Sequence, residues 1–122
     1  MNSLKLAFIT IFMLLSLLIL HKFGVSNHLY LNIWYYDIIA HFLGGIGLAL
    51  SIFYILKDRN HIITLTFVLG IIWELYEIYF GLTGHPVGSF KYLLDTIKDL
   101  IIDILGAMTV WFFVNRNKVV NI

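Results

Sequence analysis

Residues 38–56 read IIAHFLGGIGLALSIFYIL, a stretch in which only His41 and Ser51 interrupt the apolar side chains. A helix that crosses the hydrocarbon core of a bilayer needs roughly 17–25 predominantly apolar residues. The stretch therefore predicts a membrane-spanning helix.

Three further apolar stretches occupy residues 6–20, 62–80 and 93–114. With their flanks, the four stretches predict spans at about 4–22, 34–56, 61–80 and 93–114. We therefore expect an all-α fold, a four-helix transmembrane bundle. Because 122 residues leave room for only one domain, residues 1–122 are expected to form a single integral membrane domain.

Composition supports a lipid environment. Hydrophobic residues make up 61% of the chain and charged residues 12%, whereas soluble domains average about 45–50% and about 25%. A net charge of +1 and the lack of a basic stripe argue against a nucleic-acid partner. The absence of cysteine excludes thiolate metal sites and cysteine nucleophiles. Membrane lipid is the expected partner.

The first apolar stretch has an alternative interpretation as a signal peptide, because Lys5 precedes it. A signal peptide would end at a small-x-small cleavage site, and residues 21–23 read HKF instead. We therefore expect this stretch to remain as a true span.

Acidic side chains are concentrated where the membrane spans are expected. Of the seven acidic residues, six lie in or beside the spans. The second span begins with Asp37 and His41, the third ends with Glu74 and Glu77, and the fourth begins with the aspartates at 95, 99 and 103. Alternating helix directions bring these three helix ends to one side of the membrane.

Spacing also puts each polar set on one helix face, because residues three or four apart lie above one another. A carboxylate at the bilayer centre costs about 2.5–3.5 kcal/mol on insertion scales, so these faces should point into the bundle. The candidate catalytic residues are Asp37, His41, Glu74, Glu77, Asp99 and Asp103. The candidate metal ligands are His41, Glu74, Asp99 and Asp103. For Asp95 and Lys98 we expect contact with interfacial water.

Small residues in the spans predict close helix packing. Ala40 with Gly44, and Gly45 with Ala49, form small-xxx-small pairs that allow two helices to approach closely in lipid. Gly70 and Gly106 are expected to do the same in the third and fourth spans.

Three short motifs resemble those of VanZ-like membrane proteins and the related YjdF-like group: Asp37-xxx-His41, Trp73-Glu74-xx-Glu77, and Asp99-xxx-Asp103-xx-Gly106-Ala107. The resemblance covers residues 34–110. Glu77 and Asp103 stand where VanZ-like proteins have Gln and Asn, which fits the YjdF-like variant better. The VanZ-like arginine before the last span has no clear match. The resemblance implies a small multi-span membrane protein, of which one class is linked by name to glycopeptide-antibiotic resistance, and implies no particular activity.

Three functions stay open, and with them whether the protein is an enzyme. The first is an intramembrane site that binds a divalent cation and acts on, or holds, a lipid or lipid-linked head group. The second is a proton- or cation-coupled carrier or channel subunit, which would need a homo-oligomer because four helices are few. The third is a non-catalytic scaffold whose polar network only specifies helix packing.

Basic residues predict the orientation of the spans in the cell membrane. With four spans, the two termini and the turn at 57–60 share one side. That side carries Lys5, Lys57, Arg59, Arg116 and Lys118, and the other carries Lys22, Lys91 and Lys98. Because basic residues favour the cytoplasm, the termini are expected there, and the acidic site lies in the extracytoplasmic half.

A reporter fused after Asn117 should therefore read as cytoplasmic, and one inserted near Gly84 as extracytoplasmic. Paired phosphatase and fluorescent-protein fusions measure both positions. The opposite readout would invert the sidedness of the site and leave the bundle intact.

Overall fold

The computed structural model describes residues 3–119, and side chains up to residue 116. These residues form helices joined by short connections, with no strand in the described range. The helices are α1 (Ser3–Ser26), α2 (Leu29–Asn32), α3 (Tyr36–Leu56), α4 (Ile62–Phe80) and α5 (Phe90–Val119). The expected all-α bundle is confirmed.

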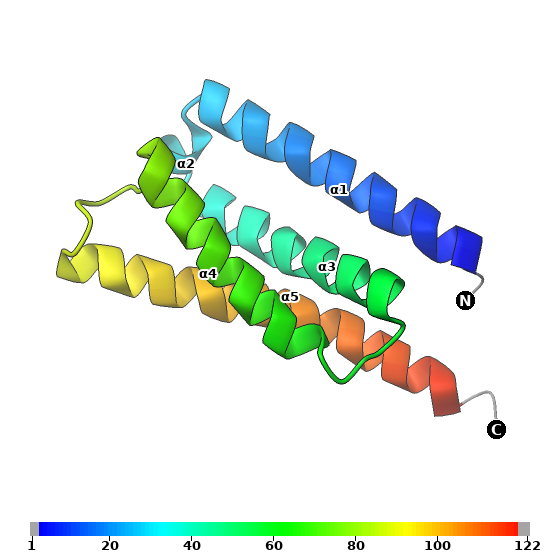
Figure 1. Cartoon of the computed structure of the whole chain (residues 1–122). Coiled ribbons are helices and arrows are strands. Elements are labelled where there is room, and N and C mark those ends of the chain that lie inside the picture. The colour runs from blue at the N-terminus through cyan, green and yellow to red at the C-terminus, as the bar shows by residue number, and fades with distance from the viewer. Residues whose placement is uncertain (1–2, 120–122) are drawn as a thin grey trace.

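The four long helices run in alternating directions (Figure 1). The start of α1, the end of α5 and the α3–α4 turn lie at one end of the bundle, and α2 and the α4–α5 loop lie at the other. Helix α3 packs against α1, α4 and α5, and its contact with α5 is the most extensive in the bundle. The starts of α3 and α5 therefore meet the end of α4, as the alternating arrangement predicts.

Three helices, α1, α3 and α4, are long and apolar enough to cross a membrane. Helix α5 is longer still, at 30 residues, but acidic side chains interrupt its first turns. Its role as a fourth span stays a prediction. Large apolar side chains such as Leu4 and Phe8 on α1 are exposed at the outer surface, as expected for helices in contact with lipid.

Helix α1 extends to Ser26, beyond the expected boundary at residue 22, and the expected polar link contains the single turn of α2. The cause is packing at Gly24, where a Cβ atom would overlap the ring of Tyr36. The Tyr36 hydroxyl also donates a hydrogen bond to the Leu20 carbonyl at 2.5 Å. Together these contacts hold the last turns of α1 against the start of α3.

Two glycines bring the backbones of α3 and α5 into contact. A Cβ atom at Gly45 would overlap the carbonyl oxygen of Asp103, and one at Gly106 would overlap the carbonyl oxygen of Phe42. Small residues at such a crossing let helices approach closely in lipid, where the hydrophobic effect does not drive them together. The predicted packing role of Gly45 and Gly106 is confirmed.

Toward the end of the bundle that holds the α3–α4 turn, the interior is apolar. Its buried core consists of Ala49, Ile52, Ile62, Ala107 and Val110. The buried polar side chains of α3, α4 and α5 lie closer to the opposite end, with the exception of Thr66. The bundle interior is thus divided into an apolar half and a polar half.

Replacing Gly45 with alanine should destabilise the fold by about 1–3 kcal/mol, as overpacking typically does, because the new methyl group meets the Asp103 backbone. Gly44→Ala is the matched control, since a Cβ atom there is 3.9 Å from its nearest neighbour. Thermal unfolding in detergent measures both variants. Equal melting temperatures for the two would contradict a backbone contact at Gly45.

Candidate functional site

The imidazole of His41 is the centre of the polar half. Its Nδ1 lies 3.1 Å from Asp103 Oδ1 on α5, within hydrogen-bonding distance. Its Nε2 lies 3.5 Å from Asp37 Oδ1, one turn earlier on α3, and 3.7 Å from Asp99 Oδ2 on α5. His41 itself is only 5% exposed. One buried imidazole is therefore surrounded by three carboxylates from two helices.

Helix α4 contributes two glutamates to the same region. The Thr96 hydroxyl donates a hydrogen bond to Glu74 Oε2 at 3.0 Å, and the Trp73 indole donates one to Glu77 Oε1 at 3.1 Å. The other oxygen of Glu74, Oε1, is buried and has no hydrogen-bond partner among the described residues. An unpaired buried acceptor is unfavourable, so this oxygen is a candidate ligand atom.

Lys98 belongs to the site, and because its side chain is still 37% exposed, the expected contact with interfacial water stays a prediction. Its Nζ donates hydrogen bonds to Asp95 Oδ1 at 2.6 Å and to Asp37 Oδ2 at 3.0 Å. It also lies 3.2 Å from Asp99 Oδ1, although this oxygen forms no hydrogen bond. Asp95, whose side chain is 36% exposed, is drawn into the same ion-pair cluster. The ammonium group ties the start of α5 to the start of α3.

The structure brings all six predicted site residues together. Its possible metal-binding groups differ from the predicted set of four metal ligands. Two groups of ligand atoms lie within 4.8 Å of one another: Asp37, His41 and Asp99 form one, and His41, Glu74 and Glu77 form the other. Asp103 belongs to neither group and lies against Nδ1 of His41. Whether any of these residues binds metal or takes part in catalysis stays a prediction.

His21 is a neighbour of the site that the sequence analysis did not identify. Its Nδ1 lies 3.1 Å from the Tyr30 hydroxyl, and its ring packs edge-on against Trp73 at 5.0 Å. Burial raises the pKa of Tyr30 above its ordinary value, so its hydroxyl stays protonated at neutral pH. Through Trp73 this aromatic cluster is connected to Glu77.

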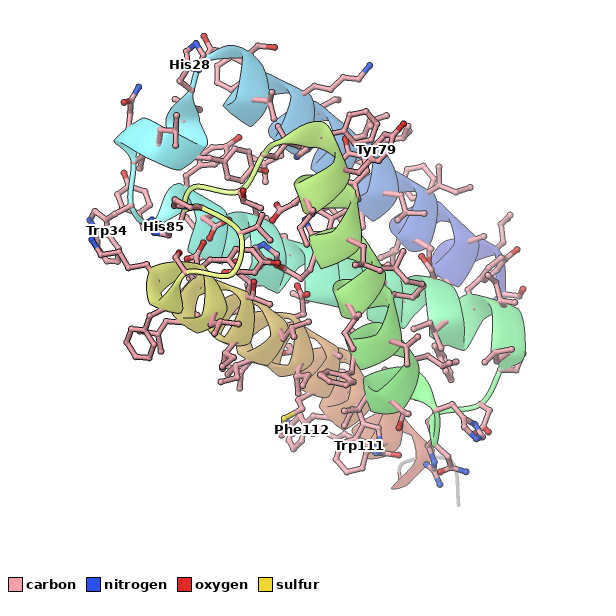
Figure 2. The ribbon with its side chains drawn as sticks, turned by 60° about the vertical axis from the view of Figure 1, so that its left-hand side comes forward. His28, Trp34, Tyr79, His85, Trp111 and Phe112 are labelled. Atoms are coloured by element: carbon pink, nitrogen blue, oxygen red, sulfur yellow. The ribbon has the colours of Figure 1, made fainter. Side chains whose placement is uncertain are left out.

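A pocket of about 600 Å³ adjoins the site. Its walls come from the end of α1, from α2, from the α4–α5 loop and from the start of α5, and Asp37, Glu77 and Asp99 line its polar side. Figure 2 shows His28, Trp34 and His85, which also line it, at this end of the bundle and far from Trp111 and Phe112. The buried acidic cluster is thus connected to a space large enough for a small ligand.

Residues 1–118 match a family described as "Predicted membrane protein (DUF2238)". The chain belongs to this family. A protein of Thermotoga maritima, described as an uncharacterized protein, is 30% identical in an alignment 118 positions long, which covers 87% of this chain and 62% of the relative. The chain thus spans about three-fifths of the length of that relative. No solved structure matches the sequence.

The family match confirms the predicted membrane protein. It gives neither the VanZ-like nor the YjdF-like name, so that affiliation stays a prediction. Nothing in the description of DUF2238 or of the relative assigns a role to the acidic cluster, whose chemistry has to be argued from its geometry.

In this DUF2238 chain, Glu74→Gln and Asp103→Asn should have strongly non-additive effects on stability. Both carboxylates neighbour His41, and residues that share a network usually couple by about 0.5–3 kcal/mol. Thermal or denaturant unfolding of the two single variants and the double variant measures this coupling. Glu74→Gln combined with Asp58→Asn, which lies in the distant α3–α4 turn, is the additive control. Strict additivity for Glu74 and Asp103 would contradict a single network.

Proposed function

We propose that this chain binds a divalent cation between His41, Glu74 and Glu77, and that the ion serves a lipid or lipid-linked head group held in the adjacent pocket. The observation that carries the proposal is the group of three ligand atoms within 4.8 Å of one another. Within that group Glu74 is 6% exposed, and its Oε1 has no partner among the described residues. A cation would give this oxygen a partner.

The same reasoning favours this group over the group of Asp37, His41 and Asp99. The two aspartates already share the ammonium of Lys98, at 3.0 and 3.2 Å. Among the described side chains no lysine or arginine forms an ion pair with Glu74 or Glu77. A metal ion would supply positive charge where no lysine or arginine lies.

The donor set suits a hard or intermediate divalent ion. Carboxylate oxygens with one imidazole nitrogen are ligands for Mg²⁺, Mn²⁺, Fe²⁺ or Zn²⁺. The contact of His41 Nδ1 with Asp103 supports this role, since metal-binding histidines usually donate their other ring N–H to a carboxylate. Asp103 then fixes the ring and leaves Nε2 available. Such an ion would polarise a phosphoryl or carbonyl oxygen, or activate water.

Charge balance also supports a bound cation. Six carboxylates gather around His41 and Lys98, and Lys98 is the only lysine or arginine among them in the described part of the chain. In an interior of low dielectric constant, closely spaced like charges cannot all stay ionised without compensation. A divalent ion supplies two of the missing positive charges.

We also propose that α5 is the fourth span and that the site lies in the extracytoplasmic half. Its buried residues Asp99 and Asp103 face the bundle, whereas Ile97, Ile101 and Leu105 on its other face are exposed. An apolar outer face opposite a polar inner face is what a span next to a polar site requires. The basic residues described above support the orientation.

A carrier of protons or ions has less support from the structure. Among residues 3–116, the buried ionisable side chains are His41, Glu74, Asp99 and Asp103, all in one half of the bundle. The other half has the apolar core around Ile52 and Ile62. A path across the membrane within one chain would have to pass this core, so a carrier would need an interface between copies.

A purely structural network is disfavoured by the unpaired oxygen of Glu74. Networks that only specify packing are stabilising when every member has its partners, and a partly satisfied network is unfavourable. A buried carboxylate with a free oxygen is more typical of a site whose ligand completes it.

Metal analysis tests the proposal. Protein purified in detergent and equilibrated with Mn²⁺ or Zn²⁺ should retain about one ion per chain, and Glu74→Gln or Glu77→Gln should lower the occupancy by about tenfold or more, because each removes a ligand. Asp58→Asn, at the opposite end of the bundle, should retain the ion. Plasma mass spectrometry measures the content and calorimetry the affinity. Unchanged occupancy in both glutamate variants would refute the site.

A further inference from the structure

We infer that the pocket of about 600 Å³ beside the acidic cluster binds an ammonium group, carried by a lipid head group or by a soluble amine. The inference rests on the proposed function for the role of the pocket as a ligand site. It adds the chemical class of the ligand. It depends on the side chains that line the pocket and not on the metal ion.

The lining of the pocket is strongly acidic. Four carboxylates, those of Asp37, Glu77, Asp95 and Asp99, line it, and Lys98 is its only lysine or arginine. Even without Glu77, which the proposed metal ion would occupy, three carboxylates face one lysine, so with neutral histidines the lining has a formal charge of −2. A positively charged group of a ligand would be attracted into this space.

The arrangement around Lys98 shows how these carboxylates hold an ammonium group. Asp95, Asp37 and Asp99 approach its Nζ to 2.6, 3.0 and 3.2 Å. Asp99, which lines the pocket, is only 2% exposed, and its Oδ1 forms no hydrogen bond although it lies 3.2 Å from the Lys98 ammonium. This oxygen keeps acceptor capacity, which a second N–H donor, brought by a ligand, would use.

Aromatic side chains complete the pocket. Tyr30 and Trp34 line it beside the acids, and the faces of such rings attract ammonium groups. Trp34 is 79% exposed, and tryptophan at the end of a span is typical of the membrane interface, where lipid head groups lie. The volume lies within the range of about 300–1,000 Å³ that is usual for small-ligand pockets. The position thus favours a lipid that carries an amine.

Calorimetry on the full chain in detergent can test the ligand class with short-chain lipids. Dihexanoyl phosphatidylethanolamine should bind, and dihexanoyl phosphatidylglycerol, which has the same chains and phosphate but no amine, should not. Free ethanolamine is the third probe. Binding of ethanolamine as tightly as the lipid indicates a soluble amine as the source, and binding of the lipid alone indicates a membrane source. Equal binding of both lipids, or no binding of either lipid and of ethanolamine, would overturn the inference.

Two variants connect this binding to the pocket. Asp95→Asn removes a lining carboxylate that belongs to neither metal group, and should weaken amine binding about tenfold or more, as expected for a lost charge-assisted hydrogen bond. Trp34→Leu removes an exposed aromatic ring from the pocket wall. It should weaken amine binding without loss of thermal stability. Asp58→Asn should change nothing. Full amine affinity in both pocket variants would overturn the inference.

Metal titration of the same samples separates the two proposals. Asp95→Asn should keep the Mn²⁺ occupancy of the parent chain, because Asp95 is not among the metal ligands. A chain that binds the amine but no metal would refute only the metal site. A chain that binds metal but no amine would refute only the present inference.

Discussion

The contact between the backbones of α3 and α5 at Gly45 and Gly106 is the constraint on which the site depends. His41 lies one turn before Gly45, and Asp103 lies almost one turn before Gly106, so the crossing that joins the glycines also joins the two side chains. The distance of 3.1 Å between His41 and Asp103 requires the helices to be this close. A larger residue at either glycine would separate the helices and weaken every contact of the imidazole with α5.

The division of the interior into two halves explains how one short bundle tolerates so many charges. The apolar core around Ile52 and Ile62 supplies close packing at the end that holds the α3–α4 turn. The polar half therefore contains carboxylates that apolar packing would exclude. The ammonium of Lys98 and the hydroxyl of Thr96 compensate part of their charge. Part of the remaining negative charge, that of Asp37, Glu77, Asp95 and Asp99, lies along the pocket.

Much of this arrangement follows from sequence periodicity. Apolar length predicts the long helices, alternation predicts which ends meet, and the i,i+4 spacing of Asp37 with His41 and of Asp99 with Asp103 predicts that they share one region. Periodicity gives the face of a helix but not the path of a flexible side chain. The direction taken by Lys98 therefore could not be foreseen, nor could the choice of Asp103 for the second nitrogen of His41. His21 meets Trp73 across 52 positions of sequence, a contact that no local pattern encodes.

The two ring nitrogens of His41 face opposite sides of the site. Nδ1 faces Asp103, deeper toward the apolar core, and Nε2 faces Asp37 and Asp99, which line the pocket. A proton on Nδ1 satisfies Asp103 and leaves the lone pair of Nε2 on the side where ligands enter. The deep carboxylate thus orients the ring, and the shallow carboxylates and Glu77 form the surface that a ligand meets. The proposed metal ion and the proposed ammonium group would both supply positive charge that Lys98 alone does not provide.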